Sequence, residues 1–181
     1  MGLMQQRMRV VRILWGALLA STFMYLVVLA FATVPQAQAV PALPPALGAS
    51  SVVLAVLSFA LPRQQAKSAL SRQKFAIADV PEGAESDVLP YREAGKTRKE
   101  FAEPERAELA AFPAYQTGLI LGSALCEAIA TFGFVLGYLR FPPWVFLPFF
   151  ALAWVLFLLR FPTRAKLRRL LEDAKGAHFP R

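Results

Sequence analysis

Residues 117–138 read TGLILGSALCEAIATFGFVLGY, a run in which Glu127 is the single charged side chain. A transmembrane helix needs roughly 20 mainly apolar residues to cross about 30 Å of hydrocarbon at 1.5 Å per residue. The run meets that length and is bounded by Tyr115 and Tyr138, amphipathic aromatic residues that are favoured at membrane interfaces. We therefore predict a transmembrane helix over residues 117–138.

Three further runs have the same apolar character, at residues 11–33, 42–61 and 141–159. Over the whole chain 56% of residues are hydrophobic and 18% are charged. Soluble domains average about 45–50% apolar and about 25% charged residues. The sequence thus predicts an all-α polytopic membrane protein with four transmembrane helices. Two transmembrane hairpins, residues 1–61 and 117–159, would form one four-helix bundle.

The first run has a second interpretation, because its flanks resemble those of a signal peptide. Arginines precede it, and Ala37-Gln38-Ala39 follows it as an A-x-A cleavage site. Its apolar core is longer than the roughly 7–15 residues of a usual signal peptide, and more hydrophobic runs follow. We therefore expect residues 11–33 to remain as a membrane anchor.

The distribution of Lys and Arg predicts the orientation. With four spans, the N-terminus, the loop 62–116 and the tail 160–181 share one side of the membrane, and they hold 19 of the 20 basic residues. The positive-inside rule places that side, with both termini, in the cytoplasm. We expect the bacterial inner (cytoplasmic) membrane. Because this bias accounts for the formal net charge of +8, we expect the lipid bilayer and no nucleic acid as a partner.

The cytoplasmic loop 62–116 carries nine basic and nine acidic residues. Its middle is polar and interrupted by proline and glycine, so we expect the loop to be partly disordered. A loop of this length is either a docking surface for a partner or a solvated linker, and the sequence leaves both possibilities open.

The cytoplasmic tail 160–181 is predicted to contain a short basic amphipathic helix, because apolar residues recur on one face from Leu167. Its arginines lie largely off that face. We expect Arg164, Arg168 and Arg169 to contact lipid headgroups, with a partner contact as the alternative.

Glu127 lies at the midpoint of residues 117–138, where an ionised side chain in the bilayer costs at least a few kcal/mol. No Lys, Arg or His lies at a matching depth, and burial without a counter-charge favours the neutral acid. We predict that Glu127 is protonated at rest or binds a cation when ionised. Ser123 and Thr131 lie on the same side of the helix, so the candidate ion-binding set is Glu127, Ser123 and Thr131. The alternative role is hydrogen bonding between helices, because the hydroxyl group of Ser21 in the first run lies at the same depth.

Four glycines of the same run, Gly118, Gly122, Gly133 and Gly137, gather on a different helix face. Their two GxxxG spacings permit close backbone contact with a neighbouring helix. We expect them to be helix-packing residues, either inside one chain or between copies in a homo-oligomer.

Residues 124–137, ALCEAIATFGFVLG, resemble the carboxylate-bearing helix of rotary ATPase proteolipid (c-ring) subunits. In that family the helix carries E-A-x-x-x-[YF]-G followed by aliphatic residues. The resemblance implies that Glu127 binds H⁺ or Na⁺, with Ser123 or Thr131 helping to coordinate it. It is confined to this one segment.

The single cysteine, Cys126, and the single histidine, His178, exclude an internal disulfide and a Cys/His metal cluster. We find no catalytic spacing, and we expect no enzyme, no catalytic residue, no cofactor and no metal site. Two functions remain. The first is H⁺ or cation binding at Glu127. The second is a membrane scaffold or assembly factor that binds a partner or a membrane-protein complex through its loop and tail, with Glu127 only in helix packing.

Overall fold

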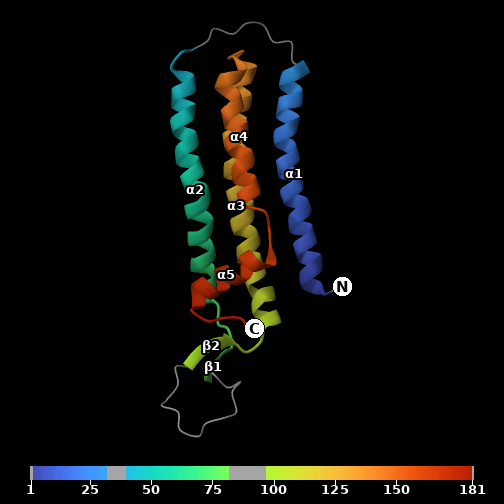
Figure 1. Cartoon of the computed structure of the whole chain (residues 1–181), viewed down its shortest axis with the longest axis vertical. Coiled ribbons are helices and arrows are strands. Elements are labelled where there is room, and N and C mark those ends of the chain that lie inside the picture. The colour runs from blue at the N-terminus through green and yellow to red at the C-terminus, as the bar shows by residue number, and fades with distance from the viewer. Residues whose placement is uncertain (1, 32–39, 82–96, 181) are drawn as a thin grey trace, which may run out of the picture. The chain divides into compact units, whose positions relative to one another are not determined.

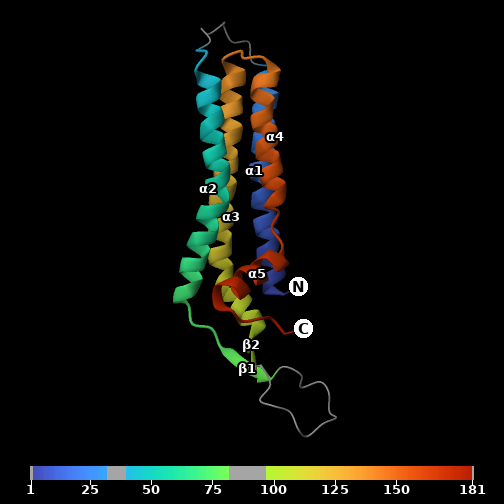
Figure 2. The same cartoon turned by 60° about the vertical axis from the view of Figure 1, so that its left-hand side comes forward.

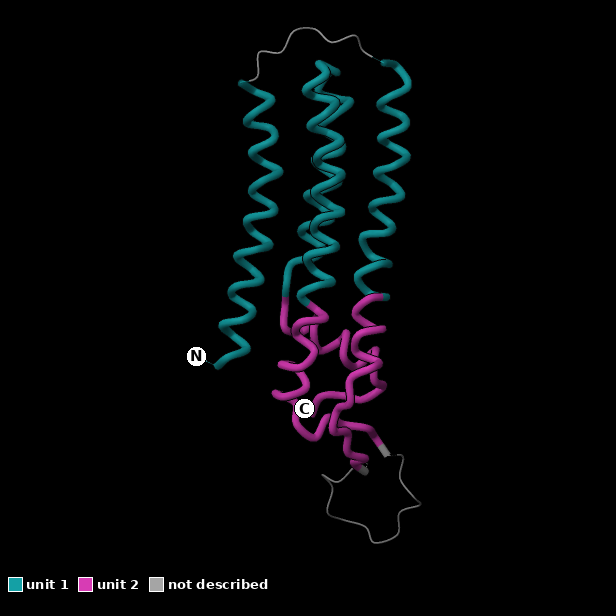
Figure 3. Tube along the Cα trace, turned by 180° about the vertical axis from the view of Figure 1, so that it is seen from behind, with its two compact units in different colours: residues 1–64, 116–162 teal, residues 65–115, 163–181 magenta. Residues whose placement is uncertain are grey.

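The computed structural model describes residues 2–31, 40–81 and 97–180. These residues divide into two compact units, coloured separately in Figure 3. Unit 1 comprises residues 1–64 and 116–162, and unit 2 comprises residues 65–115 and 163–181. The cleavage site considered above, Ala37-Gln38-Ala39, lies outside the described residues.

Unit 1 is a bundle of four apolar helices, whose course can be followed in Figures 1 and 2. They are α1 (Leu3–Phe31), the first part of α2 (Leu43–Arg72), the second part of α3 (Pro104–Tyr138) and α4 (Pro143–Leu159). In the view of Figure 2, α1 lies beside α4 and α2 lies beside α3. Each of these apolar helices is about as long as a membrane span or longer, so the four can pack along one another as a bundle.

The core of unit 1 lies mainly between α3 and α4. Its buried residues are Cys126, Ile129, Ala130, Phe150, Ala153, Leu156 and Phe157. Side chains of α1 and α2, among them Leu26 and Leu54, pack against this cluster. Many other apolar side chains of the unit remain outside the core, and Phe31 is 82% exposed. Such an apolar outer surface suits a hydrocarbon environment.

Three helices, α1, α2 and α3, are long and apolar enough to cross a membrane. The number rises to four if α4 and α5 (Arg164–Lys175) are counted together as one broken span. Alone, α4 has 17 residues, the lower end of the range of about 17–25 residues for a span. The chain is therefore a helical membrane protein.

Three helices extend beyond the runs predicted from hydropathy. α1 begins at Leu3 instead of residue 11, α2 continues past residue 61 to Arg72, and α3 begins at Pro104 instead of residue 117. The added turns are rich in Ala, Gln, Lys, Arg and Glu, which have high helix propensity but low hydropathy. The loop 62–116 is thus largely structured at both ends, and its middle, residues 82–96, lies outside the described residues.

Unit 2 adds a small β-hairpin to the predicted all-α fold. Strand β1 (Ile77–Pro81) pairs antiparallel with β2 (Thr97–Phe101), so that Ile77 is opposite Phe101. On the other side of β2, His178 forms a parallel bridge with Glu100. Phe101 is 2% exposed and packs against the ring of Phe179, with ring centroids 4.8 Å apart. The hairpin is therefore tied to the C-terminal segment.

Helix α5 in unit 2 has a capping group at each end. The Thr163 side chain accepts a hydrogen bond from the Lys166 backbone N–H at its start, and Gly176 ends it with φ of 62°. A left-handed residue at that position favours glycine. Leu167 and Leu171 are completely buried. The predicted amphipathic helix is present, and its apolar face is covered by protein.

Candidate functional site

The Glu127 carboxyl group binds two hydroxyl groups of α1. Ser21 Oγ lies 2.8 Å and Tyr25 Oη lies 3.1 Å from Glu127 Oε1. Ser21 and Tyr25 are one helical turn apart, so both hydroxyl groups reach the same carboxyl oxygen on α3. Within the described residues Glu127 makes no ion pair, which leaves hydroxyl groups as its polar partners.

The Ser21 hydroxyl group has two possible hydrogen-bond acceptors, the Glu127 carboxyl group and the Leu18 carbonyl oxygen. Ser21 Oγ also lies 2.7 Å from the Leu18 carbonyl oxygen, and a hydroxyl group has a single proton to donate. When Glu127 is neutral, Tyr25 donates to Oε1, the acid proton donates to Ser21, and Ser21 donates to Leu18. When Glu127 is ionised, Ser21 and Tyr25 both donate to Oε1 and the Ser21 contact with Leu18 is lost. The protonation state of Glu127 therefore decides whether Ser21 donates to Leu18 or to the carboxyl group.

The two α3 residues predicted to assist Glu127 have different surroundings. Thr131 Oγ1 donates a hydrogen bond to the backbone carbonyl of Glu127 at 3.0 Å. Ser123 is 1% exposed, and its hydroxyl group has no hydrogen-bond partner among the described residues. The structure thus brings Thr131 to the Glu127 backbone and brings neither hydroxyl group to the carboxyl group. Ser21 is a hydroxyl group that the sequence places at the depth of Glu127, whereas Tyr25 was missed as a partner because it lies about a hundred residues away in the sequence.

Two hydrogen bonds link α1 to α4 near this cluster. Trp154 Nε1 donates to Thr22 Oγ1 at 2.9 Å, and Trp15 Nε1 donates to the Phe157 carbonyl at 3.1 Å. Thr22 is completely buried. Buried polar groups are costly unless they are paired, so these contacts fix how α1 sits against α4.

The four predicted packing glycines all face other helices of the same chain. A Cβ atom at Gly133 would come within 2.9 Å of Phe149 on α4, and one at Gly137 would come within 2.5 Å of Leu29 on α1. The remaining two, Gly118 and Gly122, face Pro62 and Arg160. A side chain at Gly133 would push α4 away, whereas one at Gly122 would displace the Arg160 guanidinium group.

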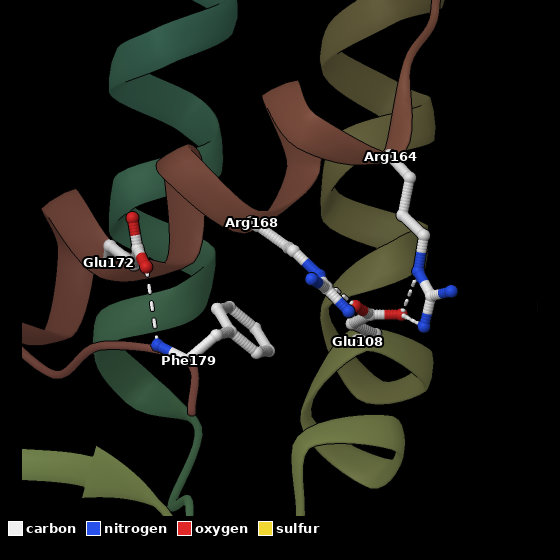
Figure 4. Close-up of polar contacts among 5 residues, drawn as sticks. All are labelled: Glu108, Arg164, Arg168, Glu172 and Phe179. Atoms are coloured by element: carbon white, nitrogen blue, oxygen red, sulfur yellow. Dashed lines mark hydrogen bonds and ion pairs between the residues drawn. The ribbon is translucent and has the colours of Figure 1, made fainter. Parts of the chain in front are cut away.

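Unit 2 contains a second buried carboxyl group, Glu108, which is 1% exposed (Figure 4). Arg164 places Nε 2.7 Å and Nη2 2.6 Å from Oε2, and Arg168 places Nε 2.5 Å from Oε1. The hydrogen bond to Glu108 raises the pKa of Arg164 above its usual value. Charge-assisted contacts of this kind are short and specific in direction. They join α5 to the first part of α3.

The sequence contains a signal for Glu108 that hydropathy does not detect. Glu108 lies on the helix face shared by Ala111, Phe112 and Tyr115, which are all buried. A charged residue on an apolar face requires a partner of opposite charge. The arginines that provide it are 56 and 60 residues away in the sequence, so the pairing itself is not readable.

Two of the three arginines predicted to contact headgroups therefore hold Glu108, and the third, Arg169, is exposed. Arg168 also lies over the ring of Phe179, 5.0 Å from its centroid. The Phe179 backbone N–H donates to Glu172 at 3.2 Å (Figure 4). These contacts bind the C-terminal segment to α5. Contact of the arginines with lipid stays a prediction.

No protein-family model, curated protein or solved structure matches the chain. Function must therefore be inferred from the chemistry of the two carboxyl groups. In the described ranges, no group of three or more His, Cys, Asp or Glu residues is placed to hold a metal ion.

Proposed function

We propose that the chain is a four-span protein of the bacterial inner membrane in which Glu127 binds and releases a proton. Both termini, the loop 62–116 and the tail 160–181 are cytoplasmic in this proposal, as the distribution of Lys and Arg favours. The observation that carries the proposal is the hydrogen-bonded cluster of Glu127, Ser21 and Tyr25. An acid within a transmembrane helix is by default a functional group.

A proton suits this cluster better than a metal cation. A bound cation requires several oxygen atoms with free lone pairs pointing at it. Here the hydroxyl groups of Ser21 and Tyr25 lie within hydrogen-bond distance of the same carboxyl oxygen, and Ser123 does not complete the set. The resemblance of residues 124–137 to a proteolipid carboxylate helix implies H⁺ or Na⁺ binding, and the contacts of Glu127 favour H⁺.

Carbodiimide labelling of Glu127 in native membranes tests the proposal. Apolar carbodiimides react with protonated carboxyl groups that are accessible from lipid, and intact mass spectrometry measures the adduct. We expect labelling that falls as the pH rises and that is absent from Glu127→Gln. Tyr25→Phe removes one of the two hydroxyl partners of Glu127 and should change the pH dependence of labelling.

The measurement is repeated with and without Na⁺ at each pH. If Na⁺ suppresses labelling at constant pH, the ligand of Glu127 is a metal cation and not a proton. Absence of labelling at every pH would contradict the proposal and leave Glu127 a packing residue. Ser50→Ala is a matched control, because this hydroxyl group is exposed and bonded within its own helix. It should leave the pH dependence unchanged.

A second function, a scaffold that binds a partner through its cytoplasmic residues, is favoured by the order of unit 2. Glu108 and the β-hairpin give this unit a packed interior, which a solvated linker does not need. Glu108→Ala should then shrink the complex that contains the protein on native gels, while carbodiimide labelling of Glu127 stays normal. Unchanged complex size would contradict the scaffold function.

A further inference from the structure

Two arginines of unit 1 gather around one phenylalanine ring. The guanidinium carbon of Arg160 lies 4.6 Å from the centroid of Phe59, and that of Arg63 lies 6.0 Å from the same centroid. Arg63 lies on α2 and Arg160 directly follows α4. The ring thus brings together two cationic groups from separate helices, and cation–π attraction helps to hold them there.

Arg160 extends toward the interior of the bundle. Its Nη2 donates a hydrogen bond to the Ser58 carbonyl, and its Nε is buried with no partner among the described residues. The guanidinium group occupies the space beside Gly122, where a Cβ atom would overlap it. Gly122 therefore leaves room for a charged group as well as for a helix.

This pair of cations has no anion of its own. Unit 1 contains six arginines but one acid, Glu127, which is engaged with Ser21 and Tyr25. Neither Arg63 nor Arg160 forms an ion pair within the described part of the chain. Two like charges on one ring repel each other, so an anion between them would stabilise both.

Their place in the sequence indicates which anion is available. Arg63 follows the apolar run 42–61, and Arg160 follows the run 141–159. In the four-span arrangement proposed above, on which this step rests, both residues lie at the same membrane face. Basic side chains between transmembrane helices at that depth are within reach of lipid headgroups.

We propose that the phosphate of an anionic phospholipid binds between Arg63 and Arg160 beside Phe59. Guanidinium groups match phosphate oxygens with paired N–H donors, and the unpartnered Nε of Arg160 supplies one such donor. Arg63 is exposed, so a ligand can reach its guanidinium group. This site is distinct from Glu127 and from the arginines of α5.

Native mass spectrometry of the full chain in detergent tests the site, with phosphatidylglycerol and phosphatidylcholine as the two probes. We expect the wild type to retain one phosphatidylglycerol in preference to phosphatidylcholine, whose choline group neutralises the phosphate. Arg63→Gln should weaken this binding about tenfold or more, because it removes a charge-assisted contact. Arg140→Gln removes an arginine of the same unit outside the Phe59 cluster and should leave binding unchanged.

Two further variants examine the geometry. Arg160→Lys keeps the charge but loses the planar donors, and Gly122→Ala displaces the guanidinium group, so both should weaken binding. Equal binding by Arg63→Gln and wild type, or equal loss in Arg140→Gln, would overturn the site in favour of nonspecific attraction. If inorganic phosphate alone binds as well as phosphatidylglycerol, the ligand of this site is free phosphate and not a lipid.

The Glu127 measurement separates this inference from the proposed function. Arg63→Gln should keep the pH-dependent carbodiimide labelling of the wild type, because Arg63 touches neither Glu127 nor its hydroxyl partners. Loss of lipid binding with normal labelling would support the lipid site. Normal lipid binding together with no labelling in the wild type would leave this site standing and overturn the proton site.

Discussion

Glu108 is a buried carboxyl group whose two partners are both partly in solvent. The side chains of Arg164 and Arg168 are 48% and 41% exposed, whereas Glu108 is 1% exposed. Removing the acid thus leaves two cations that water can reach, but removing both cations leaves a buried charge without compensation. The second loss is the more costly one.

We therefore predict an asymmetric mutational result. Glu108→Gln should lower the free energy of unfolding by about 1–3 kcal/mol, and the double variant Arg164→Gln/Arg168→Gln should lower it by about 3–5 kcal/mol. Thermal unfolding in detergent, followed by circular dichroism, measures both. The control is Arg106→Gln, which breaks an exposed pair with Glu103 and should cost under about 1 kcal/mol. Equal losses in all three variants would contradict the argument.

Helix α5 depends on its two caps because it is short. It has 12 residues, a length at which isolated helices are marginal in water. Thr163 satisfies a free N–H group at its start, and Gly176 adopts the left-handed conformation that ends it. Both features hold the face that buries Leu167 and Leu171.

Replacing either cap should loosen unit 2. Thr163→Ala should cost about 1 kcal/mol, and Gly176→Ala about 1–2 kcal/mol because φ at this position is positive. Limited proteolysis after Arg and Lys of α5 reads out the loss of order. Thr163→Ser and Gly176→Asn supply matched controls, since serine caps equally well and asparagine tolerates this conformation. Protection equal to that of the wild type in the Ala variants would show that packing alone maintains the helix.

The strands and extended helix ends were not predictable from hydropathy. β1 and β2 have five residues each, and β2 holds three consecutive charged residues, Arg98, Lys99 and Glu100. Apolar and polar residues therefore do not alternate over a stretch long enough to predict a strand. The strands are ordered by distant contacts, through His178 on one side and Phe179 against Phe101. Tertiary contact therefore determines this part of the fold, where local propensity does not.

At the scale of the whole molecule, apolar length was the most informative signal. The helical character and several apolar helices of membrane-spanning length were predictable, because each hydrophobic run must satisfy its backbone internally in lipid. Glu127 was recognisable as an isolated charge in such a run. Ser21 was recognisable by its matching depth, but Tyr25 was not, since the pairing of α1 with α3 is set by packing.

Orientation gives a prediction for the entire chain. Cys126 is completely buried, so a membrane-impermeant maleimide should leave the wild type unlabelled in intact cells. Trp144→Cys, at a position 77% exposed near the start of α4, should be labelled from outside. His178→Cys should be labelled after the membrane is permeabilised and not before. The opposite pattern for the two variants would reverse the proposed topology.

The two indole hydrogen bonds between α1 and α4 also give the protein a built-in optical reporter. Trp15 and Trp154 both span that helix pair, and Trp154 stacks on Phe23 with ring centroids 4.5 Å apart. The third tryptophan, Trp144, is the exposed one. In Trp144→Phe, all tryptophan emission would come from the α1–α4 contact, so its wavelength and its quenching by brominated lipids would follow the separation of these helices without a label.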